Sequence, residues 1–127
     1  MYRFIKYWLP PIVWMIIIFV LSARPRIPVS DSYTVSFIVF KTLHMIEYAT
    51  LYFLLFRAFY SQKKMSIRDK YLYPFIIAVL YAASDEIHQT FVPTREGRLR
   101  DVVIDCIGIT LMYSYIKLRL STLKRLL

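Results

Sequence analysis

The chain has 127 residues, of which 58% are hydrophobic and 17% aromatic, and its mean hydropathy is +0.49. This length suits one domain, and the apolar fraction exceeds the ~45–50% of an ordinary soluble domain. The formal net charge is +9, but the basic residues lie between apolar blocks, so we expect them to face lipid headgroups and expect no nucleic-acid partner. The single cysteine excludes an internal disulfide.

Four apolar blocks run over about residues 7–22, 36–60, 71–91 and 99–118. Each approaches the ~20 residues that a helix needs to cross a bilayer. They predict an all-α integral membrane protein in which residues 1–127 form one domain, a small bundle of about four transmembrane helices. The first block has a basic start, as a signal peptide does, but Leu21 is bulky where cleavage requires a small residue, so we expect the block to be retained.

The distribution of Lys and Arg predicts the orientation in a bacterial cell membrane. Eleven basic residues fall in the N-terminal segment, the linker between the second and third blocks, and the C-terminal tail, whereas six fall on the opposite side. By the positive-inside rule both termini are cytoplasmic. The loops around Pro25 and Pro93 are then extracytoplasmic.

Ionisable residues interrupt three of the blocks. The stretch 83–89 (Ala-Ser-Asp-Glu-Ile-His-Gln) ends the third block, and four further residues lie in the second and fourth blocks: His44, Glu47, Asp101 and Asp105. A charge within the bilayer costs from a few to ~10 kcal/mol, so such side chains face a partner or a cavity and mark function. At ~1.5 Å per residue, Glu47, Asp85 and Asp105 lie at similar depths. We therefore expect an acidic, imidazole-lined pocket that opens outward.

The residue types in this pocket leave several chemistries open. In an enzyme, Glu47, Asp85, Glu86 and His88 would exchange protons with the substrate, and the remaining residues would bind it: His44, Gln89, Arg95, Asp101 and Asp105. A divalent metal is an alternative, with His44, Asp85, His88 and Asp105 as candidate ligands. We expect Arg24, Arg95 and Arg98 at the rim, where they could hold a phosphate or carboxylate.

Each polar residue also has a purely structural interpretation. Arg95 or Arg24 could pair with the carboxylates and fasten the helices together. Asp101 begins a helix, where a carboxylate commonly caps free amides. Lys41 is expected at headgroup level, with the hydrocarbon span running from about Thr42 to Phe59.

At these residues the sequence resembles the VanZ family, small bacterial membrane proteins linked to resistance to glycopeptide antibiotics, teicoplanin in particular. Three motifs carry the resemblance: Leu21-Ser22-x-x-Pro25, Lys41-x-x-His44-x-x-Glu47-Tyr48, and the longest, Asp85-Glu86-x-His88-Gln89-x-Phe91-Val92-Pro93-x-Arg95-x-Gly97-x-x-x-Asp101-Val102-x-x-Asp105-x-x-Gly108. Two departures are Ala23-Arg24, where the family more often has Ser and Gln, and Thr94, where a Gly is usual. The resemblance implies a membrane location and an envelope or antibiotic-response role, but no particular reaction.

Three functions follow as hypotheses. In the first, the outward pocket engages a glycopeptide or a cell-wall precursor and so reduces drug susceptibility. In the second, the protein is a hydrolase or transferase, using acid/base or metal-assisted chemistry on a lipid-linked or peptidoglycan substrate. In the third, it is a structural accessory of another membrane protein. All three place it among membrane lipids.

Overall fold

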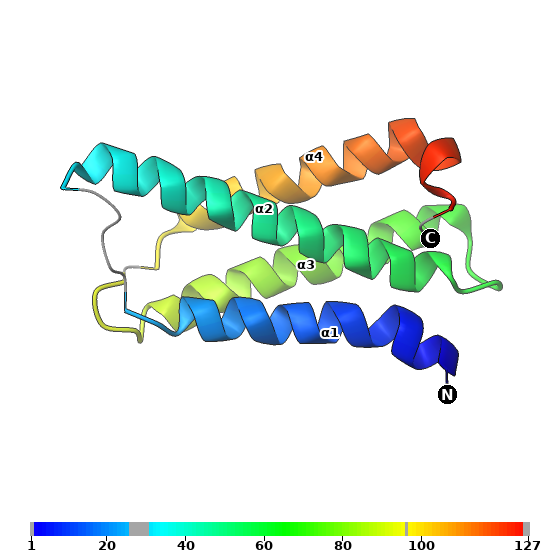
Figure 1. Ribbon diagram of the computed structural model, residues 1–127, viewed down its shortest axis with the longest axis horizontal. Coiled ribbons are helices and arrows are strands. Elements are labelled where there is room, and N and C mark those ends of the chain that lie inside the picture. Colours follow the sequence, from blue (N-terminus) through cyan, green and yellow to red (C-terminus); the bar gives the residue numbers. More distant parts are fainter. Residues whose placement is uncertain (1, 26–30, 96, 126–127) are drawn as a thin grey trace.

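The computed structural model describes residues 2–25, 31–95 and 97–125, and over these ranges the chain is all-helical, without strands. Four helices follow one another: α1 (Tyr2–Ser22), α2 (Tyr33–Tyr60), α3 (Ile67–Gln89) and α4 (Leu99–Leu123). They run up and down as a bundle, with the two chain termini at the same end (Figure 1). Helix α2 is central because it packs against each of the other three. The expected all-helical fold is confirmed.

The helices extend beyond the apolar blocks that predicted them. Helix α3 begins at Ile67, before the apolar run, because the side chain of Ser66 accepts a hydrogen bond from the Asp69 amide at 3.1 Å and so caps the first turn. Helix α1 continues through Pro10 and Pro11. The apolar pattern therefore located the helices but understated their lengths.

An aromatic core fills the half of the bundle near the chain termini. Tyr52 and Phe56 of α2 are fully buried, and the ring of Phe56 lies 4.7 Å from that of Tyr71 on α3. Tyr52 also contacts Tyr113 of α4, with ring centroids 6.2 Å apart. Nearer the other end, Gly108 brings α4 against α2 so closely that a Cβ at this position would overlap the backbone carbonyl of Met45.

The outer surface of the bundle is apolar. Helices α1 and α2 are both long and apolar enough to cross a membrane, judged by length and composition. Large apolar side chains also point outward from the other two helices, including Leu80 (63% exposed) on α3 and Leu111 (58%) on α4. Asp85, Glu86, Asp101 and Asp105 are, by contrast, buried. The bundle thus turns its carboxylates inward and many of its aliphatic side chains outward.

The two ends of the bundle differ in chemistry. We call the end that carries the chain termini and the α2–α3 linker the basic end, because eleven Lys and Arg residues belong to it by sequence. We call the opposite end, which carries the α3–α4 loop and the start of α4, the site end. The buried polar side chains described next lie towards the site end.

Candidate functional site

Asp85 is the centre of a hydrogen-bonded group that joins α1 to α3. Its carboxylate is buried (3% of the residue is exposed) and accepts hydrogen bonds from the Ser22 hydroxyl and, at 2.8 Å, from the side-chain amide of Gln89. Gln89 lies one turn further along α3, so the two side chains share a face. A carboxylate with two donors is stabilised in an interior that would reject it unpaired.

Arg95, in the loop after α3, extends this group to the end of α1. Its guanidinium donates to Gln89 Oε1 at 3.1 Å, to the carbonyl of Leu21 at 3.1 Å and to the carbonyl of Arg24 at 2.9 Å. The last carbonyls of a helix lack intrahelical donors and carry partial negative charge. A cation therefore suits this position, and Arg95 fastens the end of α1 to the α3–α4 loop.

A second group of charges lies between α2 and α4. Lys41 Nζ is 2.6 Å from Asp101 Oδ2, and both side chains are at most 10% exposed. One turn deeper, His44 Nδ1 lies 3.7 Å from Glu47 Oε2 and 4.0 Å from Asp105 Oδ1. The structural alternative for Asp101 was that of a helix cap, but the N-cap of α4 is Arg98, and none of the side chains that the structure describes caps this end. Asp101 is instead buried and pairs with Lys41.

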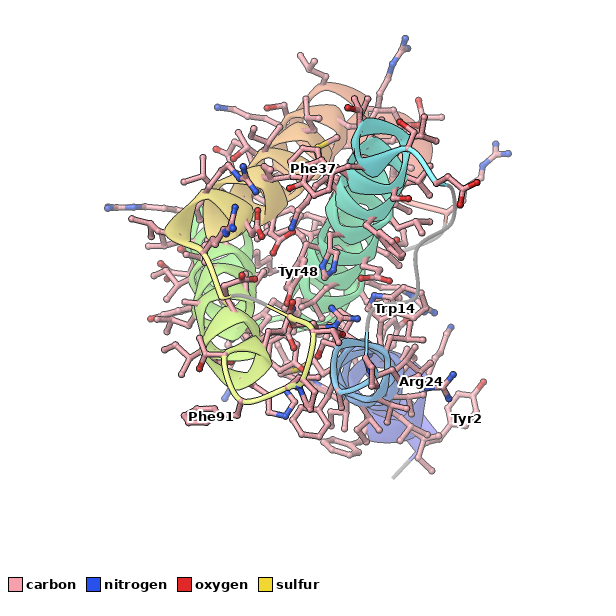
Figure 2. All side chains as sticks on the ribbon, turned by 90° about the vertical axis from the view of Figure 1, so that its left-hand side faces the viewer. Tyr2, Trp14, Arg24, Phe37, Tyr48 and Phe91 are labelled. Atoms are coloured by element: carbon pink, nitrogen blue, oxygen red, sulfur yellow. The ribbon has the colours of Figure 1, made fainter. Side chains whose placement is uncertain are left out.

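The two groups are electrostatically connected. Glu47 interacts with Asp85 and with Arg95, and Asp105 interacts with Asp85. The hydroxyl of Tyr48, buried between these carboxylates, lies near Asp85 without reaching the geometry of a hydrogen bond. Viewed from the site end, Tyr48 occupies the middle of the bundle, whereas Phe91 points outward (Figure 2). The structure thus brings together carboxylates from α2, α3 and α4.

Glu86 and His88 make separate contacts. The backbone amide of Arg98 donates to Glu86 Oε1 at 2.7 Å, which holds the start of α4 against α3. The ring of His88 packs on Phe19 of α1, with centroids 4.5 Å apart, whereas His44 faces α4. Within residues 2–25, 31–95 and 97–125, no three His, Cys, Asp or Glu side chains are placed to hold a metal ion. Of the four candidate metal ligands, His44 and Asp105 lie near each other, whereas Asp85 and His88 each have separate partners.

A pocket of about 490 Å³ opens at the site end above this cluster. Its wall contains three arginines, two aromatic residues, a threonine and one carboxylate: Arg95, Arg98, Arg100, Tyr33, Phe37, Thr94 and Asp101. The expected lining was acidic and imidazole-rich, but the observed lining is mainly cationic, because the acidic side chains turn into the bundle and bind partners there. The first turn of α4 lies beside the pocket and adds the positive end of a helix dipole.

Arg95 and Arg100 illustrate how the pocket arginines are held. Arg100 donates to Asp101 Oδ1 at 3.3 Å and its guanidinium lies 4.8 Å from the centre of the Phe37 ring. Arg95 is fixed by the contacts described above. Arg24, expected at the rim, has an exposed side chain and contributes only its backbone carbonyl to the Arg95 contact.

Two residues of the cluster were not assigned to it from the sequence: Ser22 and Lys41. Ser22 follows a purely apolar block, and its role depends on how α1 is rotated in the bundle. Lys41 could have been found, because it and Asp101 lie at similar depth near the same end of neighbouring helices. A lysine and an aspartate at one depth in an apolar surrounding are expected to pair.

The fold and the site define a class: a small helical bundle with an apolar exterior and a buried charged cluster, as expected of a membrane protein. The sequence profile of the VanZ/LLP1 family matches residues 7–120, which is most of the chain. The chain therefore belongs to the VanZ/LLP1 family. No curated protein and no solved structure matches it significantly.

Proposed function

We propose that the protein is a VanZ-like multi-pass membrane protein in which all four helices cross the bilayer. Helices α3 and α4 contain more polar residues than α1 and α2, yet their outward faces are apolar. On α4, exposed apolar side chains recur every four residues at Val103, Ile107, Leu111 and Tyr115. Such a continuous stripe would be a costly exposed patch in water and is compatible with lipid.

The charge distribution supports an orientation with the basic end in the cytoplasm. Eleven of the 17 Lys and Arg residues belong to this end, which the positive-inside rule places on the cytoplasmic side. The site end and its arginine-lined pocket then open on the extracytoplasmic side of the bacterial membrane. There they would meet lipid-linked cell-wall precursors and drugs that act on the envelope.

In this proposal the pocket engages an anionic group of an envelope component, or of a lipid-anchored glycopeptide of the teicoplanin type, and so reduces susceptibility to the drug. The observation that supports the proposal is that three arginines and two aromatic side chains line the pocket at the site end. The planar guanidinium groups of Arg95, Arg98 and Arg100 suit phosphate or carboxylate oxygens, and Tyr33 and Phe37 add apolar contact beside them.

The geometry favours binding over catalysis. Of the four groups that the enzyme hypothesis requires as reactive, Asp85 and Glu86 are buried and held by partners from outside α3. Glu47 lies beside His44 of its own helix, and His88 packs on Phe19. A general acid or base must reach the substrate to within about 3 Å. Asp85, through Gln89, and Glu86, through the Arg98 amide, support residues of the pocket wall, so we assign these two a positioning role.

The test measures teicoplanin susceptibility in a susceptible Gram-positive host that expresses the chain. The double variant Arg98→Gln/Arg100→Gln removes two pocket cations and keeps the backbone amide that binds Glu86. A charge-assisted hydrogen bond contributes about 1.5–3 kcal/mol, so losing two lowers affinity at least a hundredfold and returns the inhibitory concentration to that of the empty host. The matched control, Arg24→Gln, removes one cation at the same end but outside the pocket, and it keeps wild-type protection.

Full protection by the double variant, at wild-type levels in the membrane, contradicts the proposal. A companion measurement of lipid-linked precursors and cell-wall products separates binding from catalysis. Under the binding proposal these pools are the same with and without the protein. A product that disappears together with Glu47→Gln or Asp85→Asn would favour the enzyme.

A further inference from the structure

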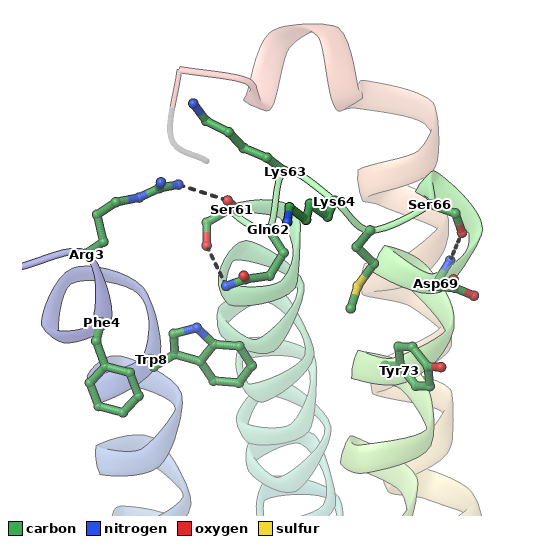
Figure 3. Close-up of a pocket in the computed structure, with 11 residues that line it drawn as sticks. Arg3, Phe4, Trp8, Ser61, Gln62, Lys63, Lys64, Ser66, Asp69 and Tyr73 are labelled. Carbon is green, nitrogen blue, oxygen red and sulfur yellow. Dashed lines mark hydrogen bonds between the residues drawn. The ribbon is translucent and has the colours of Figure 1, made fainter. Parts of the chain in front are cut away.

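A second pocket, of about 780 Å³, opens at the basic end, where the start of α1 faces the linker between α2 and α3 (Figure 3). Three cations line it, Arg3, Lys63 and Lys64, and one carboxylate, that of Asp69. The volume lies within the ~300–1,000 Å³ that is usual for small-molecule sites. The function proposed above makes no use of this pocket.

The cationic side of the pocket is partly preorganised. Arg3 donates from one guanidinium nitrogen to the backbone carbonyl of Ser61 at 3.0 Å, which directs its side chain across the gap between α1 and the linker. A guanidinium carries five N–H donors, so this contact leaves others for an anion. Lys63 and Lys64 follow Ser61 closely in the sequence, so the three cations surround one opening.

Aromatic side chains form the part of the pocket that lies along the helices. Figure 3 shows Phe4 and Trp8 on α1 and Tyr73 on α3 below the cationic linker. The ring of Trp8 packs edge-on against Phe59, with centroids 5.1 Å apart, and Phe59 lies 6.0 Å from Tyr73. Amphipathic rings of this kind prefer the level where headgroups meet acyl chains. The polarity therefore changes from cationic to apolar in the direction from water to lipid.

We propose that this pocket binds the headgroup of an anionic phospholipid. The phosphodiester lies against Arg3, Lys63 and Lys64, and the glycerol and first methylenes of the acyl chains lie along Phe4 and Trp8. Basic pockets between helices on the cytoplasmic side recognise anionic headgroups in this way. The inference rests on the proposed membrane location but is independent of any effect on glycopeptides.

The test is native mass spectrometry of the purified full chain in detergent, titrated with phosphatidylglycerol or with phosphatidylcholine of the same acyl chains. Wild type is expected to bind phosphatidylglycerol at least tenfold more tightly. The variant Lys63→Gln/Lys64→Gln alters two exposed side chains and is expected to lose ~30-fold in affinity, which corresponds to about 1 kcal/mol for each basic residue near a headgroup. The control Lys124→Gln/Arg125→Gln makes the same charge change in the tail of the same end, and its expected loss is under threefold.

Three results overturn the proposal. Equal losses of affinity for phosphatidylglycerol in the two double variants mean that the lipid is attracted by the overall positive charge of this end and not by the pocket. Equal affinity for the two lipids means that the net negative charge of the headgroup is not recognised. Full competition by glycerol 3-phosphate at the lipid's own concentration assigns the pocket to a soluble phosphate compound instead of a lipid. Because the experiment uses purified protein and no antibiotic, its outcome is separate from that of the susceptibility test.

Discussion

The buried ion pair between Lys41 and Asp101 gives the most quantitative test of the cluster. Its two charged atoms are 2.6 Å apart, and the side chains are 10% and 8% exposed. Removing one member of a buried pair leaves the other charge uncompensated and costs about 3–5 kcal/mol, whereas replacing both with apolar residues of similar size is often neutral. The variants Lys41→Met, Asp101→Leu and their combination complete a double-mutant cycle.

The structure refines these magnitudes. In Lys41→Met the Asp101 carboxylate keeps the Arg100 guanidinium at 3.3 Å, but this partner is half exposed to solvent. We therefore expect a loss near the lower limit, about 3 kcal/mol of unfolding free energy. In Asp101→Leu the ammonium of Lys41 remains within the influence of Glu86 and Asp105, so a similar loss is expected. The double variant should lie within about 1.5 kcal/mol of wild type, which gives a coupling energy of at least about 4.5 kcal/mol.

The assay is reversible unfolding in mixed micelles by a denaturing detergent, followed by the fluorescence of the two tryptophans. Lys124→Met is the control, because it makes the same chemical change at an exposed position and should shift stability by less than about 0.5 kcal/mol. A loss below about 1 kcal/mol for Lys41→Met, or strictly additive effects in the double variant, would refute the buried pair.

Three further predictions concern the packing, the loop and the topology. Gly108→Ala places a methyl group against the α2 backbone and should cost about 1–3 kcal/mol in the same unfolding assay. Thr94, whose φ is 67°, occupies the left-handed region, so Thr94→Gly should stabilise by about 1 kcal/mol, while Thr94→Ala, still bearing a Cβ, should not. In a Cys106→Ser background, a membrane-impermeant maleimide applied to whole cells should label a cysteine at Phe91 but not one at Gln62; the reverse pattern would invert the proposed orientation.

The number and order of the helices could be predicted from the sequence because hydrocarbon imposes a simple constraint on length and composition. The helix ends could not. Helix α3 gains a turn before the apolar run through its Ser66 cap. Helix α4 kinks at Arg119 (φ −115°, ψ 18°), directly after the predicted block, and a further turn then ends at Leu123. An apolar block in the sequence indicates only the part of a helix that is kept from water. Helical hydrogen bonding of the backbone can extend beyond the block where a cap or a polar turn follows, so the block does not define the helix ends.

Position along a helix axis could be estimated from the sequence, and it predicted which acids lie near one another. Contacts that depend on the rotation of a helix about its axis could not be predicted. Glu47, Asp85 and Asp105 were expected at one level, and the structure places them within electrostatic reach of one another. The partner of Lys41, Asp101, lies on another helix, so the sequence around Lys41 alone does not predict the pair. The role of Ser22 depends on the rotation of α1, and an almost uniformly apolar block carries little information about rotation.

The backbone conformation of the loop between α3 and α4 explains one of the departures from the VanZ motif. The resemblance leads us to expect a glycine at position 94, and Thr94 adopts a backbone conformation (φ 67°) that glycine enters without steric cost. Gly97, three residues further on, has no room for a side chain, since a Cβ there would overlap the backbone carbonyl of Glu86 as well as the Thr90 side chain. The loop is thus shaped by backbone geometry, and Thr94 is a departure that this chain tolerates at some cost in stability.

The buried acids and the pocket arginines form one system. Glu86 holds the backbone of Arg98, and Asp101 accepts from Arg100. Asp85 orients Gln89, which in turn holds Arg95.

Each pocket arginine is therefore connected to a buried carboxylate, either directly or through one intervening side chain. An arginine at the mouth of a pocket keeps one orientation only if the groups that hold it are themselves rigid. A carboxylate buried between apolar helices is rigid, because losing its hydrogen-bond donors would cost it several kcal/mol. In the proposed function, the acids buried in the bundle interior would thereby fix the geometry with which the arginines meet an anion outside it. A neutralised acid should consequently weaken ligand binding through displaced arginines, even though the acid itself makes no contact with the ligand.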